Sequence, residues 1–161
     1  MTGFRALERS AVGLAATGAV AALLMVAAEL TPIAKVDVAS GSCEVIGDAD
    51  PDLADRCSLS GLERHGGALL LIGALCLVMS YGAGIGRSRP ASAALLAIGA
   101  IVLGITLLRD LPETSRTGAI GRNFEGAEGE KAVGFWLELV AGGLAMGTGA
   151  AGWLRERTGQ R

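Results

Sequence analysis

Four stretches of this chain are apolar over lengths that match the thickness of a membrane. A hydrocarbon core of about 30 Å is crossed by roughly 20 helical residues, with a usual range of about 17–25. Each stretch carries at most one charged residue, and the four cover residues 10–30, 66–85, 91–108 and 132–154. None shows the alternation of a barrel strand, so they predict four transmembrane α-helices.

The distribution of positive charge favours one orientation in the membrane. The segments before the first stretch, between the second and third, and after the fourth hold seven of the 14 basic residues but only two of the 16 acidic ones. Cytoplasmic loops are typically rich in Lys and Arg. We therefore expect an all-α four-helix bundle, one integral membrane domain over 1–161, with both termini inside and the loops 31–65 and 109–131 outside.

Composition adds a source and a location to this expectation. Arg outnumbers Lys twelve to two, and Ala and Gly fill the apolar stretches. This usage is typical of a GC-rich genome, so we expect a multi-pass protein of a bacterial plasma membrane. An alternative for the first stretch is a secretory signal cleaved after Val26-Ala27-Ala28, which would leave three spans. Its apolar run is longer than the ~7–15 residues of most signals.

Two of the three cysteines lie in the first outer loop. An oxidising compartment favours a disulfide between Cys43 and Cys57, which could contribute about 3 kcal/mol by closing the loop. The alternative is a pair of free thiols. Cys76 lies within the second apolar stretch and is interpreted as a small apolar packing residue.

The same loop carries alternate carboxylates that resemble the start of a calcium-binding loop. An EF-hand requires Gly at its sixth position and Glu at its twelfth, where this chain has Leu53 and Leu59. A weak calcium site and a solvated acidic loop both remain open. The residues concerned are Asp48, Asp50, Asp52 and Asp55.

Ionisable residues gather near the outer ends of the predicted helices. A charge at membrane depth is costly and normally faces protein or water, with a partner. We expect Glu138 to pair with Arg109, Glu29 to pair with Arg64, and His65 to supply a further donor. The group could lock the bundle as an ion-pair network, or form a ligand site or ion pathway. Its members are Glu29, Arg64, His65, Arg109, Asp110 and Glu138.

Small residues recur four positions apart on two of the predicted spans. Gly82 and Gly86 form such a pair on the second span, and Gly143 and Gly147 form another on the fourth. Small residues at this spacing let helix backbones approach closely. We expect these faces to pack the bundle internally, with an interface to a second copy or another membrane protein as the alternative.

Several functional classes find little support in the sequence. A net charge of −2 argues against a nucleic-acid partner, and a single His excludes bis-histidine haem within one chain. No cofactor is expected, because the chain has no zinc-protease, phosphate-loop or serine-hydrolase motif. An enzyme is therefore disfavoured, although Glu138, Asp110 and His65 leave the question open.

The layout resembles the claudin-type tetraspan plan of four spans, inner termini and a longer first outer loop with two cysteines, here Cys43 and Cys57. The resemblance covers topology and that pair alone, because the loop lacks the family's Trp and Gly-Leu-Trp elements. We assign no family on this basis.

The leading interpretation of function is a non-enzymatic accessory, assembly or cell-envelope interaction subunit. Its candidate partners are the lipid bilayer, a second copy and another membrane protein. The alternative is an oligomeric channel or a proton- or ion-coupled transporter that uses the outer charged residues. A weaker alternative is a membrane enzyme acting on a lipid.

Overall fold

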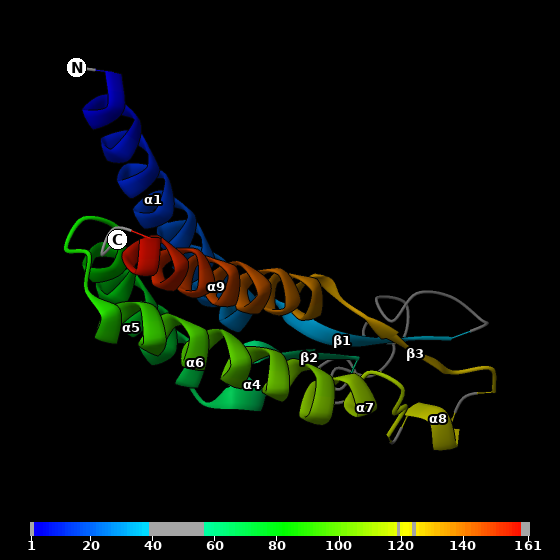
Figure 1. The fold of residues 1–161 in the computed structure, drawn as a ribbon. Coiled ribbons are helices and arrows are strands. Elements are labelled where there is room, and N and C mark those ends of the chain that lie inside the picture. Colours follow the sequence, from blue (N-terminus) through cyan, green and yellow to red (C-terminus); the bar gives the residue numbers. More distant parts are fainter. Residues whose placement is uncertain (1, 39–56, 119, 124, 159–161) are drawn as a thin grey trace.

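A computed structural model describes residues 2–38, 57–118, 120–123 and 125–158. In this part of the chain, long helices form a bundle and a small sheet lies at one end of it (Figure 1). The start of the first helix, the end of the last and the turn between the middle two lie at the other end. We call these the sheet end and the termini end. The long helices are α1 (Thr2–Leu30), α5 (Ala68–Gly84), α6 (Arg89–Ile105) and α9 (Val133–Thr158).

Three helical segments among the described residues are long and apolar enough to cross a membrane. They are Ser10–Leu30 within α1, Arg89–Glu113 starting with α6, and Val133–Arg157 within α9. The second predicted span, over 66–85, corresponds to α5, which is apolar but covers 17 residues. The structure therefore supports a mostly helical protein with three membrane-length helices.

The helical segment that begins with α6 runs past residue 108, where the third predicted span ends. Helix α6 continues into η1, a π-helical turn over Thr106–Asp110, and then into the short helix α7 (Leu111–Glu113). Pro112 lies near the start of α7, where a missing backbone N–H is tolerated. The extended segment carries Thr106 and Asp110 to the sheet end of the bundle.

The two predicted outer loops contain a three-stranded antiparallel sheet that the sequence analysis did not anticipate. Strand β1 (Pro32–Asp37) lies between β2 (Ser58–Ser60) and β3 (Glu128–Lys131), with Ala34 opposite both Leu59 and Lys131. The short helices α4 (Gly61–His65) and α8 (Ile120–Asn123) accompany the strands. A second small core is formed by Val36, Val38, Cys57 and Ile120. We call the sheet, α4, α8 and this small core the cap. The sheet thus joins one outer segment to the other.

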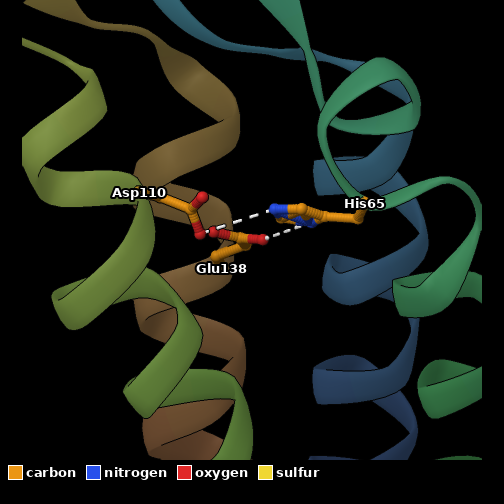
Figure 2. A group of neighbouring side chains, drawn as sticks. All are labelled: His65, Asp110 and Glu138. Carbon is orange, nitrogen blue, oxygen red and sulfur yellow. Dashed lines mark ion pairs between the residues drawn. The ribbon is translucent and has the colours of Figure 1, made fainter.

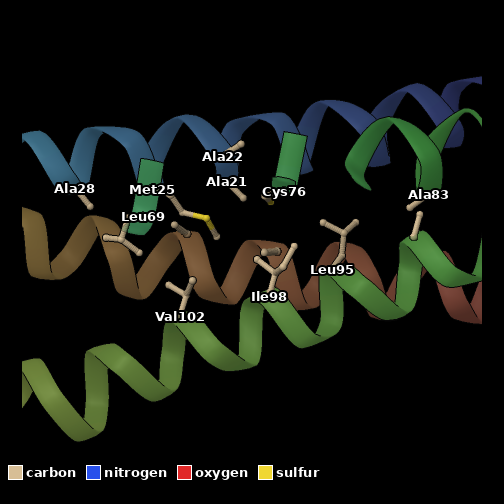
Figure 3. Close-up of a cluster of buried hydrophobic side chains, with 13 residues drawn as sticks. Ala21, Ala22, Met25, Ala28, Leu69, Cys76, Ala83, Leu95, Ile98 and Val102 are labelled. Atoms are coloured by element: carbon tan, nitrogen blue, oxygen red, sulfur yellow. The ribbon is translucent and has the colours of Figure 1, made fainter. Parts of the chain in front are cut away.

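The main core fills the bundle with small and branched apolar side chains (Figure 3). Met25 of α1 and Leu69 and Cys76 of α5 are completely buried, as are Leu95 and Val102 of α6. Cys76 therefore packs in the core, in line with its interpretation as a small apolar residue. Among the described residues, the buried charged side chains Glu29, Asp110 and Glu138 lie outside this cluster, and the buried hydroxyls of Ser80 and Thr148 donate to backbone carbonyls of their own helices.

Glycine allows close helix contact, but mostly at positions other than the predicted ones. A Cβ added at Gly99 or Gly142 would collide at the α6–α9 contact, and one added at Gly18 would collide with Ser80. By contrast, a Cβ at Gly143 or Gly147 would meet nothing within 4 Å.

Both exposed glycines of α9 lie on its outward face, so that face does not pack inside the chain as expected. On α5, Gly82 approaches Ala91, whereas Gly86 is exposed and approaches only the backbone of Gly82. The internal packing expected for Gly82 therefore has a counterpart in the structure, and that expected for Gly86 does not.

Two expectations for the first outer loop fall outside the described residues. Cys57 is buried beneath the sheet, but Cys43 lies outside the described part of the chain, so their disulfide stays a prediction. The same holds for the calcium-site candidates Asp48, Asp50, Asp52 and Asp55.

Candidate functional site

The short helix α4 places the basic side chains of Arg64 and His65 at the sheet end of the bundle. Its N-terminus is fixed by a capping box, in which Ser60 accepts from the backbone N–H of Glu63 and Glu63 accepts from that of Ser60. At its C-terminus Gly66 adopts a left-handed conformation with φ of 63°, and Gly67 follows with φ of 89°. This turn points His65 back into the bundle, toward η1 and α9 (Figure 2).

Thr106 and Asp110 mark the inward face of the helical segment that runs from α6 through η1. Both are completely buried, whereas Leu107, Leu108 and Arg109 between them are exposed. Positions four apart lie on the same face of a helix, and the π-helical turn keeps these two so. Asp110 is therefore directed into the bundle and Arg109 away from it.

Together with α9, these elements bring His65, Asp110 and Glu138 into contact (Figure 2). His65 Nδ1 lies 3.2 Å from Glu138 Oε1, and His65 Nε2 lies 3.4 Å from Asp110 Oδ2. Glu29 Oε2, from the end of α1, lies 3.8 Å from His65 Nδ1. Three carboxyl groups from three separate elements thus surround one imidazole, and we call these four residues the His65 cluster.

Arg64 is the basic partner of this cluster. Its Nε donates to Asp110 Oδ1 at 3.0 Å, and its Nη2 donates to the carbonyl oxygen of Arg109 at 2.9 Å. Nη2 also lies 3.7 Å from Glu113 Oε2. Arg64 therefore joins α4 to η1 and α7, instead of pairing with Glu29 as expected.

Glu29 instead caps the N-terminus of α5. Its carboxylate accepts from the backbone N–H of Gly67 at 2.5 Å and from that of Leu69 at 3.3 Å. Helix N-termini leave backbone donors without helical partners, and a carboxylate satisfies them. This arrangement fixes the position of the Glu29 carboxyl group within the His65 cluster.

The expected pair between Arg109 and Glu138 is also wrong. Arg109 is exposed, and no ion pair joins it to Glu138 among the described residues. Glu138 contacts His65, and its Oε2 lies 3.4 Å from the Thr106 hydroxyl. That hydroxyl also lies 2.9 Å from the carbonyl oxygen of Val102 and has one proton to donate. Glu138 is therefore poorly supplied with donors.

Several polar atoms of the cluster are buried without a hydrogen-bond partner. They are both ring nitrogens of His65, Oδ2 of Asp110 and Oε1 of Glu138. Buried polar atoms in native proteins nearly always have a partner, and those that do not require an explanation. His65 Nδ1 faces Glu138 Oε1 and His65 Nε2 faces Asp110 Oδ2, so a species bound at one ring nitrogen could satisfy that nitrogen together with nearby carboxyl oxygens.

The balance of charge points to the kind of species. Glu29, Asp110 and Glu138 contribute three carboxyl groups, and Arg64 is the guanidinium in contact with them. Burial lowers the pKa of His65. The carboxylates of Asp110 and Glu29 act in the opposite direction and raise this pKa, whereas Arg109 and Arg64 lower it further. Because the acidic side chains outnumber the guanidinium, a bound cation would offset negative charge in this group when its carboxyl groups are ionised.

A second polar group lies at the termini end, separated from the His65 cluster by the apolar core. Ser92 Oγ donates to Glu156 Oε1 at 3.3 Å, and Arg89 Nε lies 3.6 Å from Glu156 Oε2. Between the two groups lie Met25, Leu95 and Val102, all fully buried. The described structure therefore shows no polar path through one chain from the sheet end to the termini end.

The sequence predicts every charged member of this site, but it does not predict Thr106 or the cap. Thr106 lies four residues before Asp110 inside an apolar run, and that spacing is the only signal it offers. A cleft of about 440 Å³ beneath the cap, lined by Lys35, Arg116 and Arg122 among others, was likewise not expected. Comparisons with protein-family models, curated proteins and solved structures find no match to this chain.

Proposed function

We propose that this chain is a non-enzymatic accessory subunit of the plasma membrane, with a cation bound in the His65 cluster holding its outer cap on the bundle. The observation that carries the proposal is that both ring nitrogens of His65, Asp110 Oδ2 and Glu138 Oε1 are buried without a hydrogen-bond partner, with an acidic oxygen within 3.4 Å of each nitrogen. The apolar core below supports binding from the sheet end over conduction through one chain.

The cap is the surface that this arrangement would present to a partner. The sheet joins segments from both predicted outer loops, and the cluster lies where α1, α4 and η1 end and α9 begins. Binding a cation there would tie these four elements together. We therefore infer that cation binding stabilises the outer cap in the form that meets a membrane or cell-envelope partner.

The test is the melting temperature of the purified chain in lipid nanodiscs, stripped with a chelator and then titrated with Na⁺, Mg²⁺, Ca²⁺, Mn²⁺ or Zn²⁺ at fixed pH. A cation that binds the folded state stabilises it by about 2.7 kcal/mol at a hundred times its Kd. We expect at least one cation to raise the melting temperature of the wild type and of Glu113→Gln, but not of Glu138→Gln. An equal response in Glu138→Gln would contradict the proposal.

The four-span topology is part of this proposal, with α5 as the second crossing. Its length of 17 residues is at the lower end of the usual range. Large apolar side chains are exposed on its outward face, as lipid contact would favour, including Leu71, Leu77, Val78 and Ile85. The predicted disulfide between Cys43 and Cys57 would close the first outer loop, in which case Cys43→Ser and Cys57→Ser should give the same mobility shift after alkylation.

Topology is tested by labelling intact cells with an impermeant maleimide. We expect Thr117→Cys, in the segment after α7, to be labelled above the background of the unmodified chain. Ser88→Cys, in the turn between α5 and α6, should be protected until the cells are opened. Labelling of Ser88→Cys in intact cells would place that turn outside and remove α5 as a span.

A second candidate is a cation-coupled channel or transporter. The observation in its favour is the outward face of α9, where Gly143 and Gly147 leave open space for a neighbouring chain. A pathway between copies would avoid the apolar core of each bundle. Cation flux into proteoliposomes that is present in the wild type and lost in Glu138→Gln would favour this candidate, and absence of flux with intact cation binding would remove it.

A further inference from the structure

We propose that the cation is a divalent first-row transition metal, held by one ring nitrogen of His65 and one carboxylate oxygen each of Asp110 and Glu138. The inference rests on the proposed function, because it names the ion at the same site. It goes beyond that function in fixing the ligands and the class of metal.

The spacing of the donor atoms suits a single ion. One donor atom from each of the three residues lies within 4.8 Å of the others. Zn²⁺ binds imidazole nitrogen and carboxylate oxygen at about 2.0–2.2 Å, so two ligands of one tetrahedral ion are separated by about 3.3–3.6 Å. His65 Nδ1 lies 3.2 Å from Glu138 Oε1, and His65 Nε2 lies 3.4 Å from Asp110 Oδ2. Because one ion takes only one ring nitrogen, one of these contacts would lie between two ligands, and the third residue would turn a carboxylate oxygen toward the same ion.

Burial of the donor atoms separates this group from an ordinary acidic surface. The side chains of His65, Asp110 and Glu138 are 3%, 1% and 0% exposed. Each nevertheless has at least one polar atom that lacks a hydrogen-bond partner and faces the others. An ion at the centre of the group would satisfy one such atom of each residue at once.

The donor set distinguishes between classes of metal. Ca²⁺ and Mg²⁺ favour sites made of oxygen ligands alone, whereas imidazole with carboxylates suits Zn²⁺ and similar ions. A dication would also offset the charge of the two carboxylates that it binds, because carboxyl ligands lose their protons on coordinating a metal. The donor set and the spacing therefore favour the same kind of ion.

Neighbouring groups are placed to support the ligands. Metal-bound His usually donates its other ring N–H to a carboxylate or carbonyl oxygen. Here Nδ1 faces Glu138 and Glu29, and Nε2 faces Asp110, so a carboxylate lies beside whichever nitrogen is not on the metal. Arg64 holds the other oxygen of Asp110 at 3.0 Å.

The experiment measures metal content of the full chain in nanodiscs after stripping, dialysis against Zn²⁺ and removal of free metal. We expect one tightly held equivalent per chain in the wild type. It should be lost in His65→Gln and Glu138→Gln and kept in Glu113→Gln, which lies at the same end and pairs with Arg64 and Arg116. Zn²⁺ content equal in all four proteins would overturn the proposal.

A second measurement uses the wild type alone, so its result does not depend on the folding of His65→Gln or Glu138→Gln. Wild-type protein loaded with Co²⁺ should absorb in the visible range, with the pattern of nitrogen and oxygen ligands. A thiolate charge-transfer band would place the metal on cysteine and overturn the inference. A melting temperature that responds to Na⁺ or Ca²⁺ through Glu138, with no Zn²⁺ or Co²⁺ retained, would also overturn it and leave the proposed function standing.

Discussion

His65 Nδ1 lies 3.2 Å from Glu138 Oε1 at the sheet end of the bundle, and neither atom has a hydrogen-bond partner in the described structure. The two residues come from α4 and α9, far apart in the sequence. Their approach without a satisfying hydrogen bond, beside two further carboxyl groups, is the basis for a cation at this position.

The first prediction concerns Glu138 in the absence of a bound cation. Breaking a buried ion pair by removing one partner typically costs about 3–5 kcal/mol. We expect Glu138→Gln to cost clearly less in stripped protein, because it removes an excess negative charge while Asp110 and Glu29 remain near His65. The check is thermal unfolding in nanodiscs with chelator present. A loss of the full ion-pair magnitude would mean that His65 and Glu138 form a self-sufficient pair.

The second prediction compares two arginines near Asp110. Arg64→Gln should destabilise the chain by about 3–5 kcal/mol, because it leaves the buried Asp110 carboxylate without its guanidinium. Arg109→Gln should change stability by no more than about 0.5 kcal/mol, because its side chain is exposed. Both variants are compared by thermal unfolding at the same pH. Equal losses would contradict the assignment of Arg64 as the partner.

The third prediction compares adjacent glycines of α9. A Cβ at Gly142 would lie 2.9 Å from Leu103 Cγ, so Gly142→Leu should cost about 1–3 kcal/mol or more through overpacking at the α6–α9 contact. Gly143→Leu should be tolerated in the fold, because its Cβ meets nothing within 4 Å. Melting temperature tests both. If Gly143→Leu lost its fold while Gly142→Leu kept the wild-type melting temperature, the assignment of Gly142 to the packed face of α9 and Gly143 to the exposed face would be contradicted.

Size-exclusion chromatography of the same two variants separates folding from assembly. If copies of the chain associate through the outward face of α9, Gly143→Leu should shift the wild-type assembly to a smaller species while remaining folded. An unchanged elution volume would remove that face as an interface between copies.

The fourth prediction concerns Ser60, the N-cap residue of α4. Ser60→Ala removes the side chain that accepts from the backbone N–H of Glu63, and such losses cost about 0.5–2 kcal/mol. Because α4 carries His65, we also expect weaker retention of Zn²⁺ than in the matched control Ser115→Ala, which lies outside the cluster. Zn²⁺ retention unaffected by Ser60→Ala would show that His65 is positioned by other contacts.

Much of the bundle could be predicted from the sequence, because membrane-length apolar runs are local features. The same reading collected Glu29, His65, Asp110 and Glu138, since charges at the ends of apolar runs are conspicuous. It paired them wrongly, because the direction of each side chain at the end of an apolar run depends on how the helices pack, which the run itself does not fix. Asp110 faces His65, whereas Arg109 is exposed.

The cap escaped prediction for a different reason. Strand β1 (Pro32–Asp37) pairs with β3 (Glu128–Lys131), and such non-local pairing cannot be read from either segment alone. Both outer segments are rich in charge, so neither shows a long apolar alternation. The choice between Gly142 and Gly143 as the packing residue depended on the rotation of α9, which small-residue spacing does not fix.

The most direct test is an experimental structure of the full chain, determined from crystals grown in lipid with Zn²⁺ and measured at the zinc absorption edge. The account predicts an anomalous peak between His65, Asp110 and Glu138, with ligand distances of about 2.0–2.2 Å. A site without any non-protein density, in which His65 bonds directly to the carboxyl groups of Asp110 and Glu138, would contradict it.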